Sequence, residues 1–148
     1  MNYSHSFAVT VVIDAEPAKV WEALTDPSMI KQYNSDTNIS TDWKVGSPIK
    51  WEGTLGMYRY VNKGTVLSFI PGELLEYSFW TSISDLKDSP ENYQKISYRL
   101  GKEMNGTKVT ITIYDNDPAY ETRKHIEWGW TMLANNLKNF AEKNNTRG

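Results

Sequence analysis

Hydrophobic side chains recur at every second position along much of this chain. Phe7, Val9, Val11 and Ile13 alternate with Ala, Thr and Val residues, which is the period of a half-buried β-strand. The same period recurs at 49–51, 75–79, 96–100 and 109–113, and less regular strand signals cover 57–61 and 66–70. The pattern therefore predicts an antiparallel sheet with one strand near the start of the chain and the other strands in its middle.

Turn signals separate these strands. Pro71-Gly72 and Asn105-Gly106 are typical of tight turns between antiparallel strands. Asn62-Lys63-Gly64 predicts a hairpin directly after the aromatic segment 57–61. The polar stretch 34–42 predicts an exposed loop.

Two short helices are predicted after the first strand. Pro17 suits the first turn of a helix, where its missing N–H would have no partner anyway, and Val20, Trp21 and Leu24 follow at one-turn spacing. Pro27 ends this helix, and a second short helical turn is expected over 28–33. Trp21 is expected to pack the first helix against the sheet.

A long amphipathic helix is predicted near the C-terminal end. It is expected to begin at Asp117 and Pro118, with Asp117 as its cap, and to run to about 143. Its apolar stripe consists of Ile126, Trp130, Leu133, Leu137 and Phe140. The whole pattern predicts one α+β domain over 1–148, in which a curved antiparallel sheet wraps around this helix.

Gly129 and Asp115 are expected to have structural roles. Gly129 weakens a helix by about 1 kcal/mol relative to Ala, so a close approach of the backbone to a neighbouring element is expected there. Asp115 is expected to be a solvated strand end.

Composition narrows the function classes. The net charge is −2, from 18 acidic and 16 basic residues without a block of either sign, so neither nucleic acid nor an anionic membrane is an expected partner. The absence of cysteine excludes disulfides and thiolate chemistry, and two histidines alone make a transition-metal site improbable, so no metal or cofactor is expected. With no signal segment or membrane-length apolar run, a cytoplasmic protein is the expectation.

Aromatic side chains supply the candidate site. Trp51, Tyr77, Phe79 and Tyr98 are predicted on the inner face of the sheet, facing Trp130 and Leu133 of the last helix, with His125 near the mouth. An apolar pocket with a few polar tips suits a small hydrophobic or aromatic ligand. Alternatively, these rings fill the interior and find partners among themselves.

Catalysis has little support in the sequence. No nucleophile elbow, phosphate loop or dinucleotide motif is present, and the two histidines, His5 and His125, are 120 positions apart. An acid or base role would fall to Tyr98, His125 or a pocket carboxylate. The sequence therefore favours binding over catalysis.

The order of these segments resembles a known family. The residues that carry the resemblance are Val20 to Pro27, Asp42 to Gly46, Gly64 to Val66, Pro71 to Tyr77 and Gly129 to Leu133. They are similar to the helix-grip fold of the START-like (SRPBCC) superfamily, within the branch named after the activator of the heat-shock protein 90 ATPase. The resemblance implies the fold above, and it implies no single function, because one fold hosts many.

The resemblance adds two alternatives to hydrophobic-ligand binding. One is a chaperone-linked interaction module, and the other is an enzyme similar to the polyketide cyclases or hydrolases of the superfamily. A monomer or a homodimer is expected, with the aromatic segment from Tyr58 to Tyr60 as a candidate dimer surface.

Overall fold

The structure is a computed structural model that describes residues 3–34, 36–82, 86–116 and 125–143. Its strands are β1 (His5–Ile13), β2 (Asn38–Ser40), β3 (Pro48–Leu55), β4 (Tyr58–Ile70), β5 (Leu74–Thr81), β6 (Gln94–Glu103) and β7 (Gly106–Asp115). Its helices are α1 (Pro17–Thr25), α2 (Pro27–Tyr33) and α3 (His125–Lys143), with a short 3-10 helix η1 (Pro90–Asn92).

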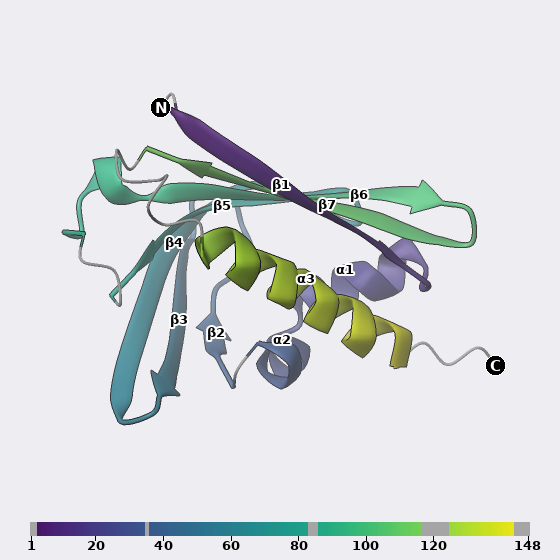
Figure 1. Ribbon diagram of the computed structural model, residues 1–148, viewed down its shortest axis with the longest axis horizontal. Helices are drawn as coiled ribbons and strands as arrows, with labels where there is room; N and C mark the ends of the chain where they lie inside the picture. Colours follow the sequence, from purple (N-terminus) through teal and green to yellow (C-terminus); the bar gives the residue numbers. More distant parts are fainter. Residues whose placement is uncertain (1–2, 35, 83–85, 117–124, 144–148) are drawn as a thin grey trace.

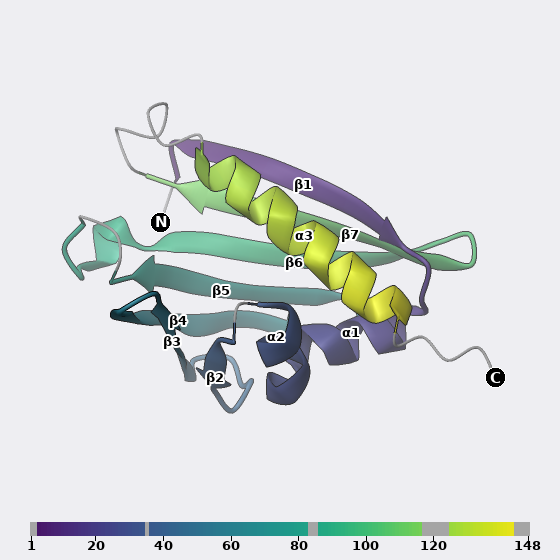
Figure 2. The same ribbon diagram turned by 60° about the horizontal axis from the view of Figure 1, so that its bottom comes forward.

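All seven strands form one antiparallel sheet in the order β1-β7-β6-β5-β4-β3-β2. The first and last strands pair along their whole length, which places Val11 beside Val109 and Val9 beside Ile111. The sheet curves, and α3 runs diagonally across its inner face, while α1 and α2 lie at one end of that face (Figures 1 and 2). This is the predicted helix-grip architecture.

The core lies between the inner face of the sheet and the three helices. Ile96, Ile111 and Ile113 are fully buried there, as expected for inward positions of alternating strands. The rings of Trp21 and Phe69 of β4 form a T-shaped pair with 5.3 Å between their centroids, which confirms the predicted structural role of Trp21.

Asp26 separates the two short helices. Its carboxylate accepts hydrogen bonds from the backbone N–H of Ser28 at 2.8 Å and of Met29 at 3.4 Å, so it caps α2 directly after α1 ends. The predicted helix boundary at Pro27 is therefore confirmed.

The predicted hairpin at Asn62-Lys63-Gly64 is wrong. β4 continues through these residues, and the turn lies earlier, at Gly56 and Met57, where Gly56 has a φ of +64°. Gly64 is needed for packing rather than for a turn, because a Cβ there would collide with the backbone carbonyl of Ser78 on β5. By contrast, a tight turn does join β6 to β7, one position before the predicted pair: Met104 and Asn105 form it, and Met104 has a φ of +53°.

The stretch 34–42 is not simply an exposed loop. It contains β2, which places Ile39 beside Trp51 in the core, and Thr37 is buried with its hydroxyl 2.6 Å from the hydroxyl of Tyr60. A three-residue strand is too short to show a period in a polar segment, which is why the sequence did not reveal it.

The described part of α3 confirms the apolar stripe. Leu137 is buried, and Trp130 and Phe140 pack against the core. The predicted start at Asp117 and Pro118 lies outside the described residues. Gly129 is exposed, and an added Cβ would have no neighbour within 4 Å, so the close approach expected there is wrong.

Candidate ligand-binding site

Five of the predicted site residues form one continuous row of aromatic rings, here called the ring row. It runs from Phe79 to Trp51 (5.2 Å between centroids), Tyr77 (5.0 Å), Tyr98 (6.0 Å) and Trp130 (6.5 Å). Each separation is in the range of direct aromatic contact. The ring row therefore crosses the inner face from β3 to α3.

Strand register brings these rings together. Trp51 is an inward position of β3, Tyr77 and Phe79 are inward positions of β5, and Tyr98 is an inward position of β6. Tyr98 lies opposite Leu75, so Tyr77 is its diagonal neighbour on the same face. Trp130 reaches the row from α3 and is half-buried.

The two tyrosines of the ring row share their polar tips. Their hydroxyl oxygens are 3.2 Å apart, so one phenol donates to the other. Burial raises the pKa of Tyr98 to about 12 and raises the pKa of Tyr77 well above its ordinary value. Both phenols are therefore neutral at physiological pH, and they can donate a hydrogen bond but cannot serve as bases.

The space between the ring row and the helices is small in this conformation. A cavity of about 30 Å³ is bordered by Trp51, Tyr77, Tyr98 and Leu133, and also by Tyr33 of α2, whose hydroxyl donates to the carbonyl of Ala23 at 2.9 Å. This volume holds roughly one water molecule. Leu133 thus lies where it was predicted, whereas the side chain of His125 lies outside the described part of the structure.

Polar groups lie at the end of the inner face beyond Phe79. Gln94 pairs with Phe79 across the strands, and its amide donates to the carboxylate of Asp115 at 2.7 Å. Asp115 is only 5% exposed, so the expectation of a solvated strand end is wrong. Asp115 is the next inward position of β7, two residues past Ile113.

Sequence reasoning missed Asn62, which is also on the inner face. Its side-chain oxygen is buried and has no hydrogen-bond partner among the residues that the structure describes. An unsatisfied buried acceptor costs about 1–3 kcal/mol. The signal that could have revealed it is the alternation of Tyr60, Asn62, Gly64 and Val66, which the misplaced hairpin interrupted.

The opposite face of the sheet carries a larger hollow of about 1330 Å³, bordered by Lys50, Lys63, Lys95, Leu67 and Tyr114 among others. Each lysine already has a carboxylate partner: Lys50 has Glu52 at 3.6 Å, Lys63 has Asp88 at 2.7 Å and Lys95 has Glu76 at 3.6 Å. The hollow thus offers a ligand no unbalanced charge. The inner face has the more specific arrangement.

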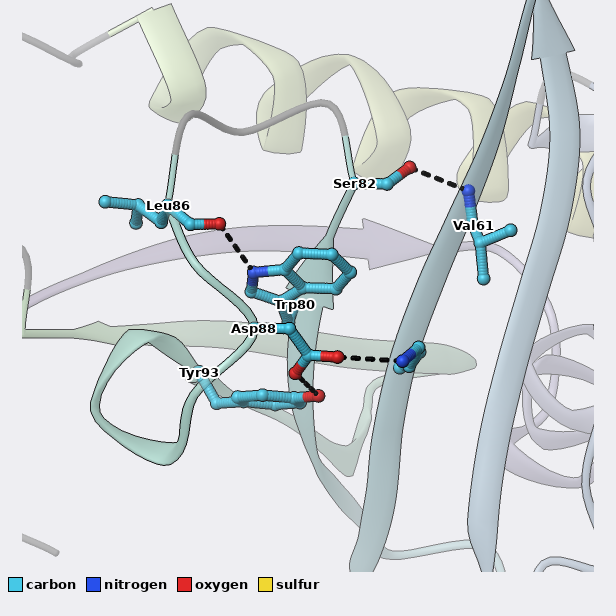
Figure 3. Close-up of polar contacts among 7 residues, drawn as sticks. Val61, Trp80, Ser82, Leu86, Asp88 and Tyr93 are labelled. Carbon is cyan, nitrogen blue, oxygen red and sulfur yellow. Dashed lines mark hydrogen bonds and ion pairs between the residues drawn. The ribbon is translucent and has the colours of Figure 1, made fainter.

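The segment 86–93 borders this outer hollow and is fastened to the sheet (Figure 3). Asp88 accepts hydrogen bonds from Lys63 at 2.7 Å and from Tyr93 at 2.6 Å, and Trp80 donates to the carbonyl of Leu86 at 3.1 Å. The hydrogen bond from Lys63 lowers the pKa of Asp88, and burial raises the pKa of Tyr93 to about 12. These contacts are structural, since they hold a connecting segment in place.

Within the described ranges, no group of three His, Cys, Asp or Glu side chains could hold a metal ion. None of the described helices is long and apolar enough to cross a membrane.

A curved antiparallel sheet around a long C-terminal helix defines the START-like, helix-grip class. Within this class, the model of the family called activator of Hsp90 ATPase homolog 1-like protein matches residues 14–142. The chain therefore belongs to this family, which confirms the resemblance found in the sequence.

Solved structures extend the comparison. The ChR145 protein of Cytophaga hutchinsonii is 36% identical, with 97% of both chains covered and a TM-score of 0.80. The Aha1 protein of Colwellia psychrerythraea, solved as a dimer, is 23% identical over 93% of this chain and 96% of its own (TM-score 0.74). CalU16 of Micromonospora echinospora is 21% identical over 92% of this chain and 75% of its own (TM-score 0.69). The latter two share the fold alone, and no curated protein matches the chain.

Proposed function

We propose that this protein binds a small hydrophobic or aromatic molecule between the inner face of the sheet and α3. The observation that carries this proposal is the ring row, which extends from Phe79 on β5 to Trp130 on α3. Aromatic faces bind flat apolar molecules, and the neutral phenols of Tyr77 and Tyr98 can orient a polar substituent.

The described cavity beside the ring row is about 30 Å³, so a ligand larger than one water needs more space there, and movement of α3 away from the sheet would supply it. Two described hydrogen bonds fasten the second half of α3 to the end of β1 and the residue after it. In the second half, Lys138 donates to the carbonyl of Val12 at 2.7 Å, and Glu142 accepts from the backbone N–H of Asp14 at 2.8 Å. In the first half, Trp128 and Met132 are exposed. We therefore propose that the first half moves to admit the ligand.

The test is a titration with an environment-sensitive apolar dye, followed by competition with aromatic and lipid-like molecules. Saturable binding near one dye per chain is expected. Trp130→Ala should weaken binding by about tenfold, the equivalent of 1.4 kcal/mol, because it removes one end of the ring row. Trp128→Ala is the matched control, since its ring is two positions away on the same helix and is 68% exposed.

Absence of dye binding by a protein with an ordered near-ultraviolet circular dichroism spectrum would overturn this proposal. Equal losses of affinity in the Trp130→Ala and Trp128→Ala variants would also contradict it, because they would show that the dye binds elsewhere. Thermal unfolding of both variants separates loss of binding from loss of folding.

The two alternatives rest on the family and not on a contact in this structure. For a cyclase-like enzyme, the high pKa of Tyr98 is unfavourable, because a neutral phenol with a pKa of about 12 is a poor acid or base near neutrality. For a chaperone-linked role, stimulation of a heat-shock protein 90 ATPase by the purified protein is the direct measurement. Cytoplasmic location likewise stays a prediction.

A further inference from the structure

One buried polar atom on the inner face has no hydrogen-bond partner in the part of the chain that the structure describes. The side-chain oxygen of Asn62 is shielded from solvent and accepts no hydrogen bond from any residue that the structure describes. Buried acceptors in folded proteins are almost always paired, so an unpaired one points to a missing partner. A leucine would fill a similar volume without the cost of an unpaired buried acceptor. The presence of an amide at this position therefore suggests that its oxygen has a partner that is not part of the described chain.

Register places Asn62 beside the end of the ring row. It lies opposite Trp51 of β3 on one side and opposite Thr81 of β5 on the other. Paired residues in an antiparallel sheet project to the same face, with Cβ atoms about 5 Å apart. Phe79, the last ring of the row, is two residues from Thr81 on the same face. The unpaired oxygen therefore lies within reach of a molecule stacked against Trp51 and Phe79.

Asn62 has the right chemistry for a neutral anchor. Its oxygen accepts a hydrogen bond without demanding a charge, whereas the carboxylate of Asp115, near the same end of the inner face, already accepts from Gln94. A hydroxyl or N–H group on an aromatic molecule would satisfy Asn62 while the ring stacks on the row.

We propose that the ligand of the inner face is an aromatic molecule bearing a hydrogen-bond donor, such as a phenolic hydroxyl, and that this donor binds the side-chain oxygen of Asn62. This inference rests on the proposed function, since it places the ligand on the ring row. It adds the polarity of the ligand and its orientation, with the donor directed toward β4.

The experiment compares naphthol with methylnaphthalene, which have nearly the same shape but differ in the donor. Affinities of both probes are measured for the wild type and for Asn62→Leu, which replaces the amide by an apolar group of similar size. The preference for naphthol is the ratio of its affinity to that of methylnaphthalene. This preference should be about tenfold larger in the wild type than in Asn62→Leu, which corresponds to one buried hydrogen bond. Asn62→Ala removes the same acceptor and should give the same change, which covers the case in which leucine disturbs folding.

The possible results distinguish a failure of the Asn62 proposal from a failure of the proposed function. If neither probe binds to the folded wild type, the proposed function itself fails. If both probes bind and their affinity ratio is the same in the wild type and in both variants, the ring row binds ligands but Asn62 does not anchor them, and the inference is overturned. A wild-type preference lost in both variants supports it.

Discussion

Tyr77 and Tyr98 show how the interior controls the chemistry of single residues. Both rings are buried, and their hydroxyls are 3.2 Å apart, so ionising either one would place a charge where water cannot solvate it. This raises the pKa of Tyr98 to about 12. The site therefore presents neutral donors over the whole physiological range.

A pH prediction follows from the sign of this shift. The folded pKa of Tyr98 lies above the unfolded value of 10.0, so its contribution to stability is complete below about pH 10 and is lost as pH rises toward 12. We expect the free energy of unfolding to fall by on the order of 2 kcal/mol across that interval through Tyr98. Urea unfolding at a series of pH values measures it.

Tyr98→Phe is the control for this prediction. The phenylalanine ring keeps its packing but cannot ionise, so the variant should lose less stability above about pH 10 than the wild type, although it is less stable at neutral pH because Tyr77 loses a hydrogen-bond partner. Parallel loss in both proteins would assign the effect to other groups.

Residue-level reasoning from the sequence succeeded where alternation was regular. Trp51, Tyr77, Phe79 and Tyr98 were placed on the inner face because period-two strands alternate between two faces, and the structure joins them into the ring row. Asn62 was missed because Asn-Lys-Gly resembles a turn, although here it lies within a strand. The sequence around Gly64 does not show that this glycine is required by the backbone of the neighbouring strand β5.

At the scale of elements, two glycines give a matched test of packing. Gly64 lies in β4, where a Cβ would collide with the backbone carbonyl of Ser78, whereas Gly129 lies in α3 with no atom within 4 Å of an added Cβ. We expect Gly64→Ala to destabilise the fold by about 1–3 kcal/mol or more, because two backbones must separate. Gly129→Ala should stabilise it by up to about 1 kcal/mol through helix propensity.

Chemical unfolding of the two variants measures both effects. Both variants replace glycine by alanine, yet the change in the free energy of unfolding should have opposite signs. The difference therefore reflects the surroundings of the two positions and not the residues exchanged. A Gly64→Ala protein as stable as the wild type would contradict the close approach of β4 and β5 at this point.

The order of the longer elements was predictable because these strands and helices have their own period or boundary signals. β2 and the true β3–β4 turn were not, because one is three residues long and the other lacks an Asn-Gly or Pro-Gly pair. Both errors lie beside β3, which pairs with β2 on one side and with β4 on the other.

The helix α3 should open unevenly. The second half contains three buried residues, Ala134, Leu137 and Ala141, whereas Trp128 and Met132 in the first half are exposed. We expect backbone amides of 129–133 to exchange with deuterium faster than those of 137–141, and a bound ligand to slow the first group most. Uniform exchange along the described helix would contradict entry by movement of its first half.

At the scale of the whole molecule, the curved sheet and the helices pack around one shared core. The ring row supplies an aromatic lining, and the described cavity beside it has a volume of about 30 Å³. Binding must therefore compete with the packing that stabilises the folded chain. A substitution that enlarges the interior space should lower the stability of the fold and raise its affinity for a small apolar ligand.

Leu133→Ala makes that exchange testable. Leu133 borders the small cavity and is half-buried, so its truncation should destabilise the protein by about 1–3 kcal/mol and enlarge an apolar space. Such spaces bind small aromatic molecules such as benzene. We expect benzene to raise the unfolding temperature of Leu133→Ala more than that of the wild type, with the exposed neighbour Met132→Ala as the control. Equal shifts in all three proteins would mean that α3 already opens without hindrance, and that interior volume does not limit binding.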